Sequence, residues 1–410
     1  MHVIGVVAEF NPFHKGHEYL ISKAREAVAD PRAIVMCIIS GPFTQRGLPA
    51  LMPKDLRARQ ALLCGADVVL ELPFAYACAP SADFARGAVE SLLSTGVLTD
   101  IAFGTDCEDP GLPEELAAAD FESDERYGAL LKDGLASGLS FPAAREEAII
   151  KISGKEEYRS VLRSPNSILA FEYLKALKAL DKKKRIRVRM IERAGEAYSS
   201  EKVENGVFAS AAGIRKIIAS EPSKAALAVR LKDTMPPASL AVMLASDIPF
   251  PDLKLYERMA FIRALTSSSE EIGAFAYMGD GLPGLIKNTA EDLRTGESFF
   301  EELNTKHFVN SRIMRAVASL MTGRRTESYI PPRYIRVLGF NREGRYCLKI
   351  MGKCSSLPIF HNDSDALELY SSDPDVKTLH TMDIKASELY ALLTGQENGS
   401  FRSISPVITK

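Results

Sequence analysis

The chain has 410 residues, of which 46% are hydrophobic, and its formal net charge is −2. This length predicts two or three domains, and so small a charge gives no global attraction to nucleic acid or membrane, so any RNA contact must come from a local basic patch. The amino-terminal pattern predicts a strand rather than a signal peptide, and no apolar run approaches the roughly 18–20 residues of a membrane span.

The first hundred residues alternate between two kinds of segment. Short apolar runs predict buried strands at Val3–Val7, Ala33–Ile39, Asp67–Leu72 and Asp100–Phe103. Amphipathic stretches between them predict helices at Glu18–Ala29, Lys54–Cys64 and Ser81–Ser94. Strands that alternate with helices indicate βαβ units. We therefore expect an α/β, Rossmann-like parallel sheet.

The rest of the chain is more helical. A helical insertion is expected over about 107–160, and Ser164 and Pro165 open a helix that runs to Ala179, with serine as its N-cap. Arg185–Ile191 alternates basic and apolar residues, as in a strand with one exposed face. After residue 220, helices are expected at Ala225–Lys232, Leu253–Leu265, Ala290–Leu303 and Ser311–Met321. From Tyr334 the pattern is that of a short mixed tail. We expect an α/β domain over 1–220, a helical domain over 221–330 that is a candidate for RNA contact, and a mixed C-terminal region over 331–410.

The six cysteines show no CxxC spacing, and several lie in apolar runs. This pattern favours buried free thiols over disulfides or metal ligands. Free thiols fit a reducing compartment, and we expect a cytoplasmic protein.

The segment "AEFNPFHKGHEYL" places His14 and His17 on the turn between the first strand and the first helix. Such turns lie at the carboxyl edge of a parallel sheet, where ligands bind. A metal site would need a third and a fourth ligand; Glu9 is near, but no further His or Cys cluster supports it. A pair of surface histidines is the plain alternative. The helix N-terminus, Gly16 and the positive charge of Lys15 favour phosphate binding, because imidazole N–H groups can donate to phosphate oxygens.

Loops that follow other strands supply weaker candidates. "SGPFTQRG", with Gln45 and Arg46, follows the second strand and is either a pocket-lining loop or an ordinary connection. "FGTD" ends the fourth strand, where Gly104 would let a nucleoside approach the backbone and Asp106 could accept a hydrogen bond.

Two helix starts are also candidates. Asn166 lies in the first turn of the helix that begins at Pro165, where it could face a ligand or act in capping. Ser210 and Arg215 in "SAAGIR" combine a helix cap with a cation one turn later, which suits a second phosphate clamp or a plain amphipathic helix.

A basic run, Lys175–Arg193, holds nine Lys or Arg in nineteen residues. Such a run is usually a solvated face, but it is also the best candidate for RNA contact, since phosphates dominate non-specific affinity. The candidate RNA-binding residues within it are Lys182, Lys183, Lys184, Arg185 and Arg187. A looser basic set comprises Arg312, Arg315, Arg324, Arg325, Arg333 and Arg336.

Seven motifs occur in one order: "VVAEFNPFHKGHEYL", "SGPFTQRGLPA", "ELPFAYA", "ADFARGAV", "FGTD", "SPNSILA" and "IRVLGF". In this combination the chain resembles the bacterial tRNA(Met) cytidine acetate ligase family of the HxGH nucleotidyltransferase superfamily. The resemblance implies that acetate attacks ATP to give acetyl-adenylate and pyrophosphate. The wobble cytidine of elongator tRNA(Met) then takes the acetyl group and becomes N4-acetylcytidine. Splayed bases of a single-stranded loop allow such access.

The resemblance also implies an ATP site, with Mg²⁺ expected to accompany ATP. His14, His17 and Lys15 would act at the phosphates, and Gly104, Asn166 and Arg193 would be further ATP contacts. The implied ATP-binding segment comprises Val7, Ala8, Glu9, Phe10, Asn11, Pro12, Phe13, His14, Lys15, Gly16, His17, Glu18, Tyr19 and Leu20. Gln45 and Arg46 are our candidates for the acetate pocket, and no resident metal site is expected.

Two other functions remain open at this point. A small-molecule adenylyltransferase would share the HxGH turn but would not need the chain beyond about residue 220. A non-catalytic RNA-binding protein with an inactive nucleotide site would bind tRNA without turning over ATP. Dependence of pyrophosphate release on acetate separates both from the acetate ligase.

Overall fold

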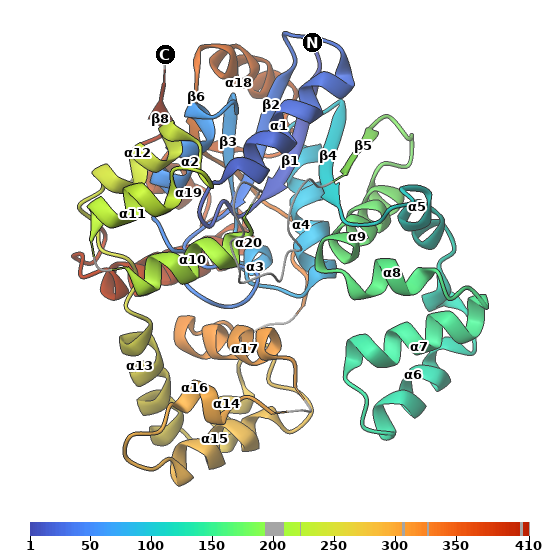
Figure 1. Ribbon diagram of the computed structural model, residues 1–410, viewed down its shortest axis with the longest axis vertical. Helices are drawn as coiled ribbons and strands as arrows, with labels where there is room; N and C mark the ends of the chain where they lie inside the picture. The colour runs from blue at the N-terminus through green and yellow to red at the C-terminus, as the bar shows by residue number, and fades with distance from the viewer. Residues whose placement is uncertain (193–208, 222, 306–307, 326–327, 402–404, 410) are drawn as a thin grey trace.

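A computed structural model describes residues 1–192, 209–221, 223–305, 308–325, 328–401 and 405–409. Within these residues the strands form one eight-stranded sheet of order β5-β4-β1-β2-β3-β6-β7, with β8 paired to β6. Helices cover both of its faces, and two helical lobes extend below it in the view of Figure 1. The predicted α/β architecture is confirmed.

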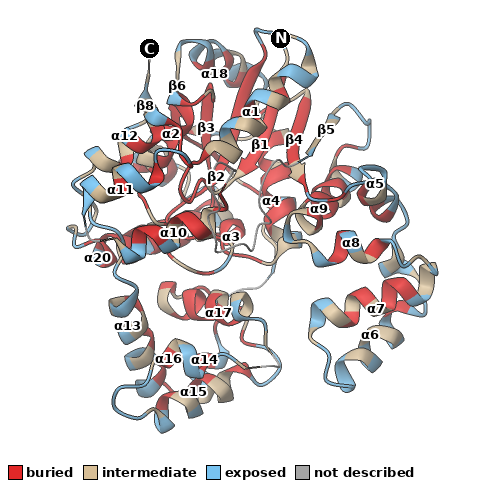
Figure 2. Cartoon of the chain, in the orientation of Figure 1, coloured by how far each residue is buried: buried red, intermediate tan, exposed pale blue. Residues whose placement is uncertain are grey.

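The strands are β1 (Val3–Ala8), β2 (Ile34–Ser40), β3 (Val68–Leu72), β4 (Asp100–Thr105), β5 (Arg187–Glu192), β6 (Ile335–Phe340), β7 (Ile359–Phe360) and β8 (Val407–Ile408). The first five pair in parallel, as the alternating pattern predicts. Successive side chains of β1 face opposite sides, so that Ile4 and Val6 pack in one core cluster and Val3 and Val7 in another. Figure 2 shows these strands as the buried centre of the molecule.

The helices of the first half frame the sheet and form its insertion. They are α1 (Lys15–Val28), α2 (Lys54–Leu63), α3 (Phe74–Ala77), α4 (Ser81–Ser94), α5 (Gly111–Ala118), η1 (Phe121–Ser123), α6 (Tyr127–Ala136), α7 (Phe141–Ser153), α8 (Tyr158–Arg163), α9 (Pro165–Leu180) and α10 (Ala211–Ser220). Ser164 and Ser210 cap α9 and α10, as predicted, because each side chain accepts a hydrogen bond from a backbone N–H three residues on.

The helices of the second half are α11 (Lys224–Leu231), α12 (Pro237–Ala245), α13 (Leu253–Thr266), α14 (Ser269–Gly273), α15 (Leu282–Asp292), α16 (Phe299–Glu302), α17 (Asn310–Thr322), α18 (Arg342–Cys354), α19 (Asp363–Leu367) and α20 (Pro374–Leu393). The single helix predicted over Ala290–Leu303 is wrong, because α15 ends at Asp292 and α16 begins only at Phe299. The predicted mixed tail contains β6 followed directly by α18 and, later, the 20-residue α20.

Residues 331–410 extend the same sheet, because β6 pairs antiparallel with β3. A buried ion cluster fixes this contact, and its members are Lys54, Glu71, Arg336, Asp363, His380 and Asp383. Lys54 Nζ lies 2.8 and 2.7 Å from the two carboxylate oxygens of Glu71. Arg336 Nε lies 3.3 Å from Glu71 and its Nη1 2.7 Å from Asp363. The division into three domains stays a prediction, but the C-terminal residues pack against the catalytic sheet.

All six cysteines are free thiols, five of them buried, which confirms the expectation from their spacing. Burial raises the pKa of the Cys64 thiol to about 11, so this group stays protonated near neutral pH. Among the described residues, no helix combines the length and the apolar character that a membrane crossing requires.

Candidate active site

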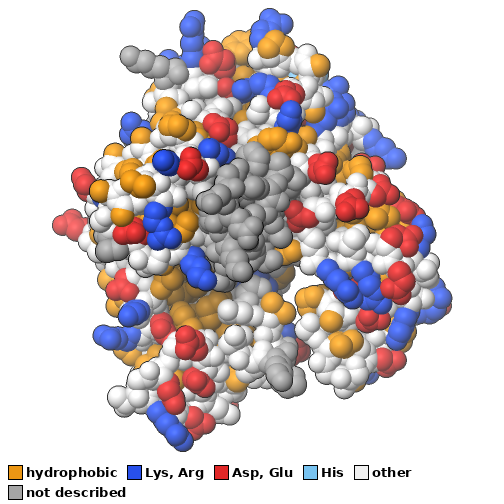
Figure 3. Space-filling view, in the orientation of Figure 1, with side chains coloured by type: hydrophobic (Ala, Val, Ile, Leu, Met, Phe, Trp, Pro, Cys, Tyr) orange, Lys and Arg blue, Asp and Glu red, His pale blue; other side chains and the backbone are white. Residues whose placement is uncertain are grey.

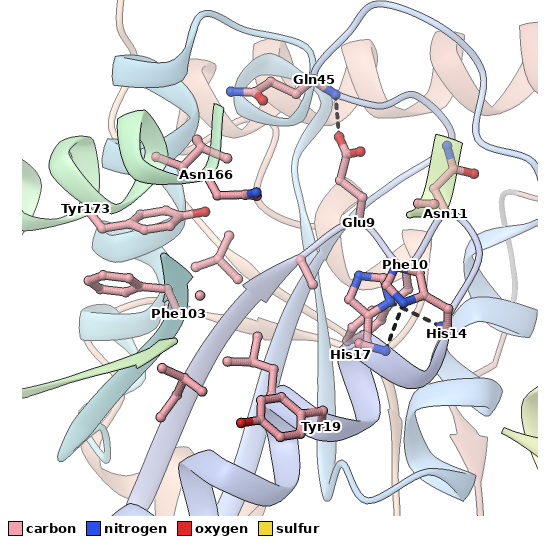
Figure 4. Close-up of a pocket in the computed structure, with 18 of the residues that line it drawn as sticks. Glu9, Phe10, Asn11, His14, His17, Tyr19, Gln45, Phe103, Asn166 and Tyr173 are labelled. Atoms are coloured by element: carbon pink, nitrogen blue, oxygen red, sulfur yellow. Dashed lines mark hydrogen bonds between the residues drawn. The ribbon is translucent and has the colours of Figure 1, made fainter. Parts of the chain in front are cut away.

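A pocket opens at the carboxyl ends of β1 and β4, the edge at which parallel sheets bind ligands. One wall comes from β1, the turn that follows it and α1, and the other from β4, α9 and the end of β5 (Figure 4). Gln45, from the loop after β2, closes a third side. The loops therefore meet where the alternating sequence pattern predicts.

The turn between β1 and α1 is held by its own histidines. His14 is the N-cap of α1, and its Nδ1 accepts a hydrogen bond from Gly16 N at 3.0 Å. The backbone N–H of His14 donates to Nδ1 of His17 at 3.2 Å, which closes a capping box. The two rings stack with centroids 3.9 Å apart. Figure 4 shows both rings at one side of the pocket.

These hydrogen bonds fix which ring nitrogens can donate. Because Nδ1 accepts a backbone N–H in both His14 and His17, a neutral ring carries its proton on Nε2. Both imidazoles are therefore N–H donors at their outer nitrogens. Donors at a helix N-terminus suit an anionic ligand, because the helix dipole adds to the same attraction. The arrangement can hold phosphate oxygens and stabilise charge on a leaving pyrophosphate.

Arg57 of α2 holds the end of β1 and the start of this turn in place. The sequence did not lead us to predict this role. Its guanidinium is fully buried, and Nη1 donates to the carbonyl oxygens of Glu9 at 2.7 Å and Ser40 at 2.9 Å. It also donates to the carbonyls of Gly41 and, at 2.9 Å, Met52. Burial lowers the pKa of the guanidinium. The sequence carried only a weak signal for this role, because Lys54 and Gln60 are buried beside Arg57 and this face of α2 is not an apolar stripe.

The opposite wall is largely apolar. The rings of Phe103 and Tyr173 lie with centroids 5.3 Å apart, beside Leu169 and Ile191. These residues were also missed, because large side chains at helical or strand spacing look like ordinary core. An apolar wall opposite a phosphate-binding turn suits the base of a nucleotide, which can pack against aromatic faces.

The side chain of Asn166 lines the pocket beside this wall. It does not cap α9, because Ser164 does. Its amide Nδ2 donates to Asp106 Oδ2 at 2.7 Å, and Ser164 Oγ donates to the same oxygen at 2.6 Å. Asp106 thus orients Asn166 and is not itself among the lining residues. Asp106 accepts hydrogen bonds, as its sequence position suggested, and a hydrogen bond from a ligand to this carboxylate stays a prediction.

The remaining predicted site residues differ in whether they line the pocket. Within the predicted ATP segment the lining residues are Val7, Ala8, Glu9, Phe10, Asn11, His14, Gly16, His17, Tyr19 and Leu20. Its other residues, which do not line the pocket, are Pro12, Phe13, Lys15 and Glu18. Gly104 and Gln45 line it, whereas Arg46 is exposed beside it. Arg193 lies outside the described residues.

The two residues of the predicted clamp on α10 have different roles in the structure. Ser210 is buried and caps α10, since its Oγ accepts from Gly213 N at 3.0 Å. Arg215 lines the pocket, and its Nη1 donates to the carbonyl oxygen of Asn11 at 2.7 Å. Arg215 therefore brings a cation to the turn that carries His14.

The lysine-rich part of the basic run lies at the other edge of the sheet, and the run then continues along β5 to Glu192, which lines the pocket. Lys182, Lys183, Lys184 and Arg185 are exposed at the entry to β5, whereas the pocket lies at its far end, about 16 Å away along the strand. Arg187 is ion-paired with Asp100 at 2.9 Å. Figure 3 shows Lys and Arg interspersed with Asp and Glu over one face of the molecule. An RNA contact at the lysine-rich part of the run stays a prediction, and it would be remote from the pocket.

The described residues contain no cluster of three or more His, Cys, Asp or Glu side chains that could hold a metal ion. The turn of His14 and His17 lies at the N-terminus of α1, a position that favours an anionic ligand, and the fold around it is that of the α/β nucleotidyltransferases.

Comparison with known proteins agrees with this class. A family model described as HIGH Nucleotidyl Transferase matches residues 1–403. A tRNA(Met) cytidine acetate ligase of Acetivibrio thermocellus is 34% identical over 100% of this chain and 99% of its own length. One from Clostridium perfringens is 32% identical, with both chains covered completely.

Two solved structures of Thermotoga maritima TmcAL are also similar. The apo form matches with a TM-score of 0.88 at 30% identity, over 100% of this chain and 99% of that one. The form bound with alpha-thio ATP matches with a TM-score of 0.85 at 29% identity and the same coverage. The chain belongs to the HIGH nucleotidyl transferase family and, within it, to the family of the tRNA(Met) cytidine acetate ligases. The resemblance that the motifs carry is thereby confirmed.

Proposed function

We propose that this protein is an ATP-dependent acetate ligase that forms N4-acetylcytidine at the wobble position of elongator tRNA(Met). The observation that carries the proposal is the turn at Phe10–His17, which presents two imidazole N–H donors at a helix N-terminus. Relatives that match along their whole length carry the name tRNA(Met) cytidine acetate ligase.

The reaction proceeds in two steps. An acetate oxygen attacks the α-phosphorus of ATP, forming acetyl-adenylate and releasing pyrophosphate. The cytidine N4 amine then attacks the acyl carbon, and AMP leaves with the electron pair of the broken C–O bond. His14 and His17 bind the phosphates, and the wall of Phe103 and Tyr173 holds the adenine. Adenylation turns acetate, which is unreactive toward an amine, into an acyl donor with a good leaving group.

Mg²⁺ enters with ATP in this proposal. It is held mainly by the nucleotide phosphates and water, as is usual for Mg²⁺ in nucleotide sites. Acetate binds between the turn and Gln45, and the anticodon loop approaches from the open side of the pocket.

The test is acetylation of tRNA by the purified protein. Mass spectrometry of nucleosides should reveal N4-acetylcytidine in elongator tRNA(Met) only when ATP and acetate are both present, with AMP and pyrophosphate formed in equal amounts. Initiator tRNA serves as the matched control. Product formed without acetate, or ATP turnover driven by a phosphate ester instead, would favour the small-molecule adenylyltransferase. Binding of tRNA without any turnover would favour the RNA-binding alternative.

A further inference from the structure

Glu9 places a carboxylate at the centre of the candidate site. It follows the last residue of β1, is partly exposed, and lines the pocket. Its Oε1 accepts a hydrogen bond from the backbone N–H of Gln45 at 2.7 Å. Among the described residues no Lys or Arg side chain forms an ion pair with this carboxylate. The backbone hydrogen bond fixes the position of the group beside the loop that carries Gln45.

Binding of the substrates does not explain this charge. ATP and acetate are both anions, so a carboxylate beside them weakens their binding by like-charge repulsion. Figure 4 shows Glu9 between Gln45 and the imidazoles of His14 and His17. The phosphates belong on the histidine side and acetate on the Gln45 side. The bond that joins acetate to the α-phosphate would therefore form next to Glu9.

The second step of the reaction requires a proton acceptor at that place. The lone pair of the cytidine N4 amine is delocalised into the ring, and the nitrogen must lose a proton as it forms the amide. Both imidazoles are unsuited to accept it, because their Nδ1 atoms already accept backbone N–H groups and their Nε2 atoms carry the proton. Among the residues that the structure describes, the other carboxylate that lines the pocket is Glu192, which ends β5, two strands from β1 and about 10 Å away.

We propose that Glu9 is the proton acceptor in the acetyl-transfer step. This inference rests on the proposed function. The N4 nitrogen forms a bond to the acyl carbon, the bond from that carbon to the AMP oxygen breaks, and AMP departs with the electron pair. One N4 proton passes to the carboxylate of Glu9, which returns it to solvent after the product leaves.

The test compares the two half-reactions in Glu9→Gln. Glutamine has nearly the same shape and keeps an oxygen that can accept from Gln45 N, but it cannot take a proton from an amine. Because Glu9 lines the pocket in which we propose that ATP binds, acetate-dependent ATP–pyrophosphate exchange should change as well, but far less than acetyl transfer does. Formation of N4-acetylcytidine should fall about 100- to 1000-fold, the usual contribution of a general base. Glu26→Gln, at the far end of α1, is the matched control and should change neither rate.

Other outcomes would overturn the assignment. Equal loss of exchange and transfer in Glu9→Gln would mean that the carboxylate serves ATP or its Mg²⁺. Wild-type transfer in Glu9→Gln would mean that another group, such as the departing phosphate, accepts the proton. Failure of the proposed function is distinct from both, because the wild-type protein would then show neither exchange nor N4-acetylcytidine.

Discussion

The pocket at the end of β1 and the buried ion cluster beneath β3 are both rich in polar side chains, but they satisfy those side chains differently. In the cluster, Lys54 and Glu71 are both almost completely buried and directly paired. In the pocket, Glu9 is held by a backbone N–H, and the two histidines are held by backbone groups of their own turn. The paired charges of the cluster stabilise the fold, whereas the polar side chains of the pocket are oriented by backbone groups at the place where we propose that the ligand binds.

The largest effect on stability should come from breaking the cluster. Lys54→Met leaves the buried carboxylate of Glu71 with only part of its compensation, from Arg336. We expect the free energy of unfolding to fall by about 3–5 kcal/mol, as when one partner of a buried pair is removed. Denaturant unfolding measures this change. An unchanged midpoint would contradict the structural role given to the cluster.

The corresponding substitution in the pocket is His17→Ala. It removes one phosphate donor, and we expect acetate-dependent pyrophosphate exchange to fall about 100- to 1000-fold. Stability should fall by only about 1 kcal/mol, because this variant no longer makes one hydrogen bond to the backbone of His14. A drop in stability as large as that of Lys54→Met would make His17 a structural residue and erase the contrast between the two regions.

The pH dependence of stability sharpens the comparison within the cluster. Burial, with the nearby charge of Glu71, raises the pKa of Asp383 to about 6. Between about pH 4 and 6 the folded protein therefore holds a proton that the unfolded chain releases, so this contribution to stability is full below about pH 4 and is lost as the pH rises to about 6. In the Asp383→Asn variant the side chain at this position has no group that titrates in this pH range.

Relative to wild type, Asp383→Asn should therefore gain on the order of 2 kcal/mol in unfolding free energy from about pH 4 to about pH 7. Urea unfolding of both proteins at the two pH values measures the difference, in which the titration of all other groups cancels. A difference that is independent of pH would show that Asp383 is ionised throughout.

The smallest effect is expected at the exposed basic run. Replacing Lys183 and Arg185 by glutamate should weaken tRNA binding and reduce the slope of log affinity against log salt by about one for each phosphate that the variant no longer neutralises. Exchange without tRNA should not change, because the lysine-rich part of the run lies at the opposite edge of the sheet from the pocket. Filter binding at several salt concentrations is the measurement. Unaltered affinity and an unaltered slope would show that the run does not contact tRNA.

Much of the fold could be predicted because its pattern is local. β1 to β4 lie where short apolar runs predict them, and Ser164 and Ser210 cap the predicted helices. α18 escaped prediction because it follows β6 without a break in its mixed apolar and basic pattern. The pairing of β6 with β3 joins residues more than 250 positions apart, and no local signal specifies it.

The same distinction between local patterns and long-range contacts applies to the candidate site. The HxGH turn could be located from sequence, because a strand, a glycine and a helix start are read within a dozen residues. Arg57 and Tyr173 could not, because their roles depend on which loops and strands the fold brings beside them. Asp106 could be placed at the sheet edge, but its engagement with Asn166 depends on how α9 packs.

The central claim is that the turn of His14 and His17 activates acetate with ATP. The most direct measurement is ATP–pyrophosphate exchange by the purified wild-type protein, with and without acetate, repeated with elongator tRNA(Met) present. The account predicts exchange that requires acetate and that His17→Ala abolishes. Absence of acetate-dependent exchange both with and without tRNA, in a correctly folded protein, would contradict it.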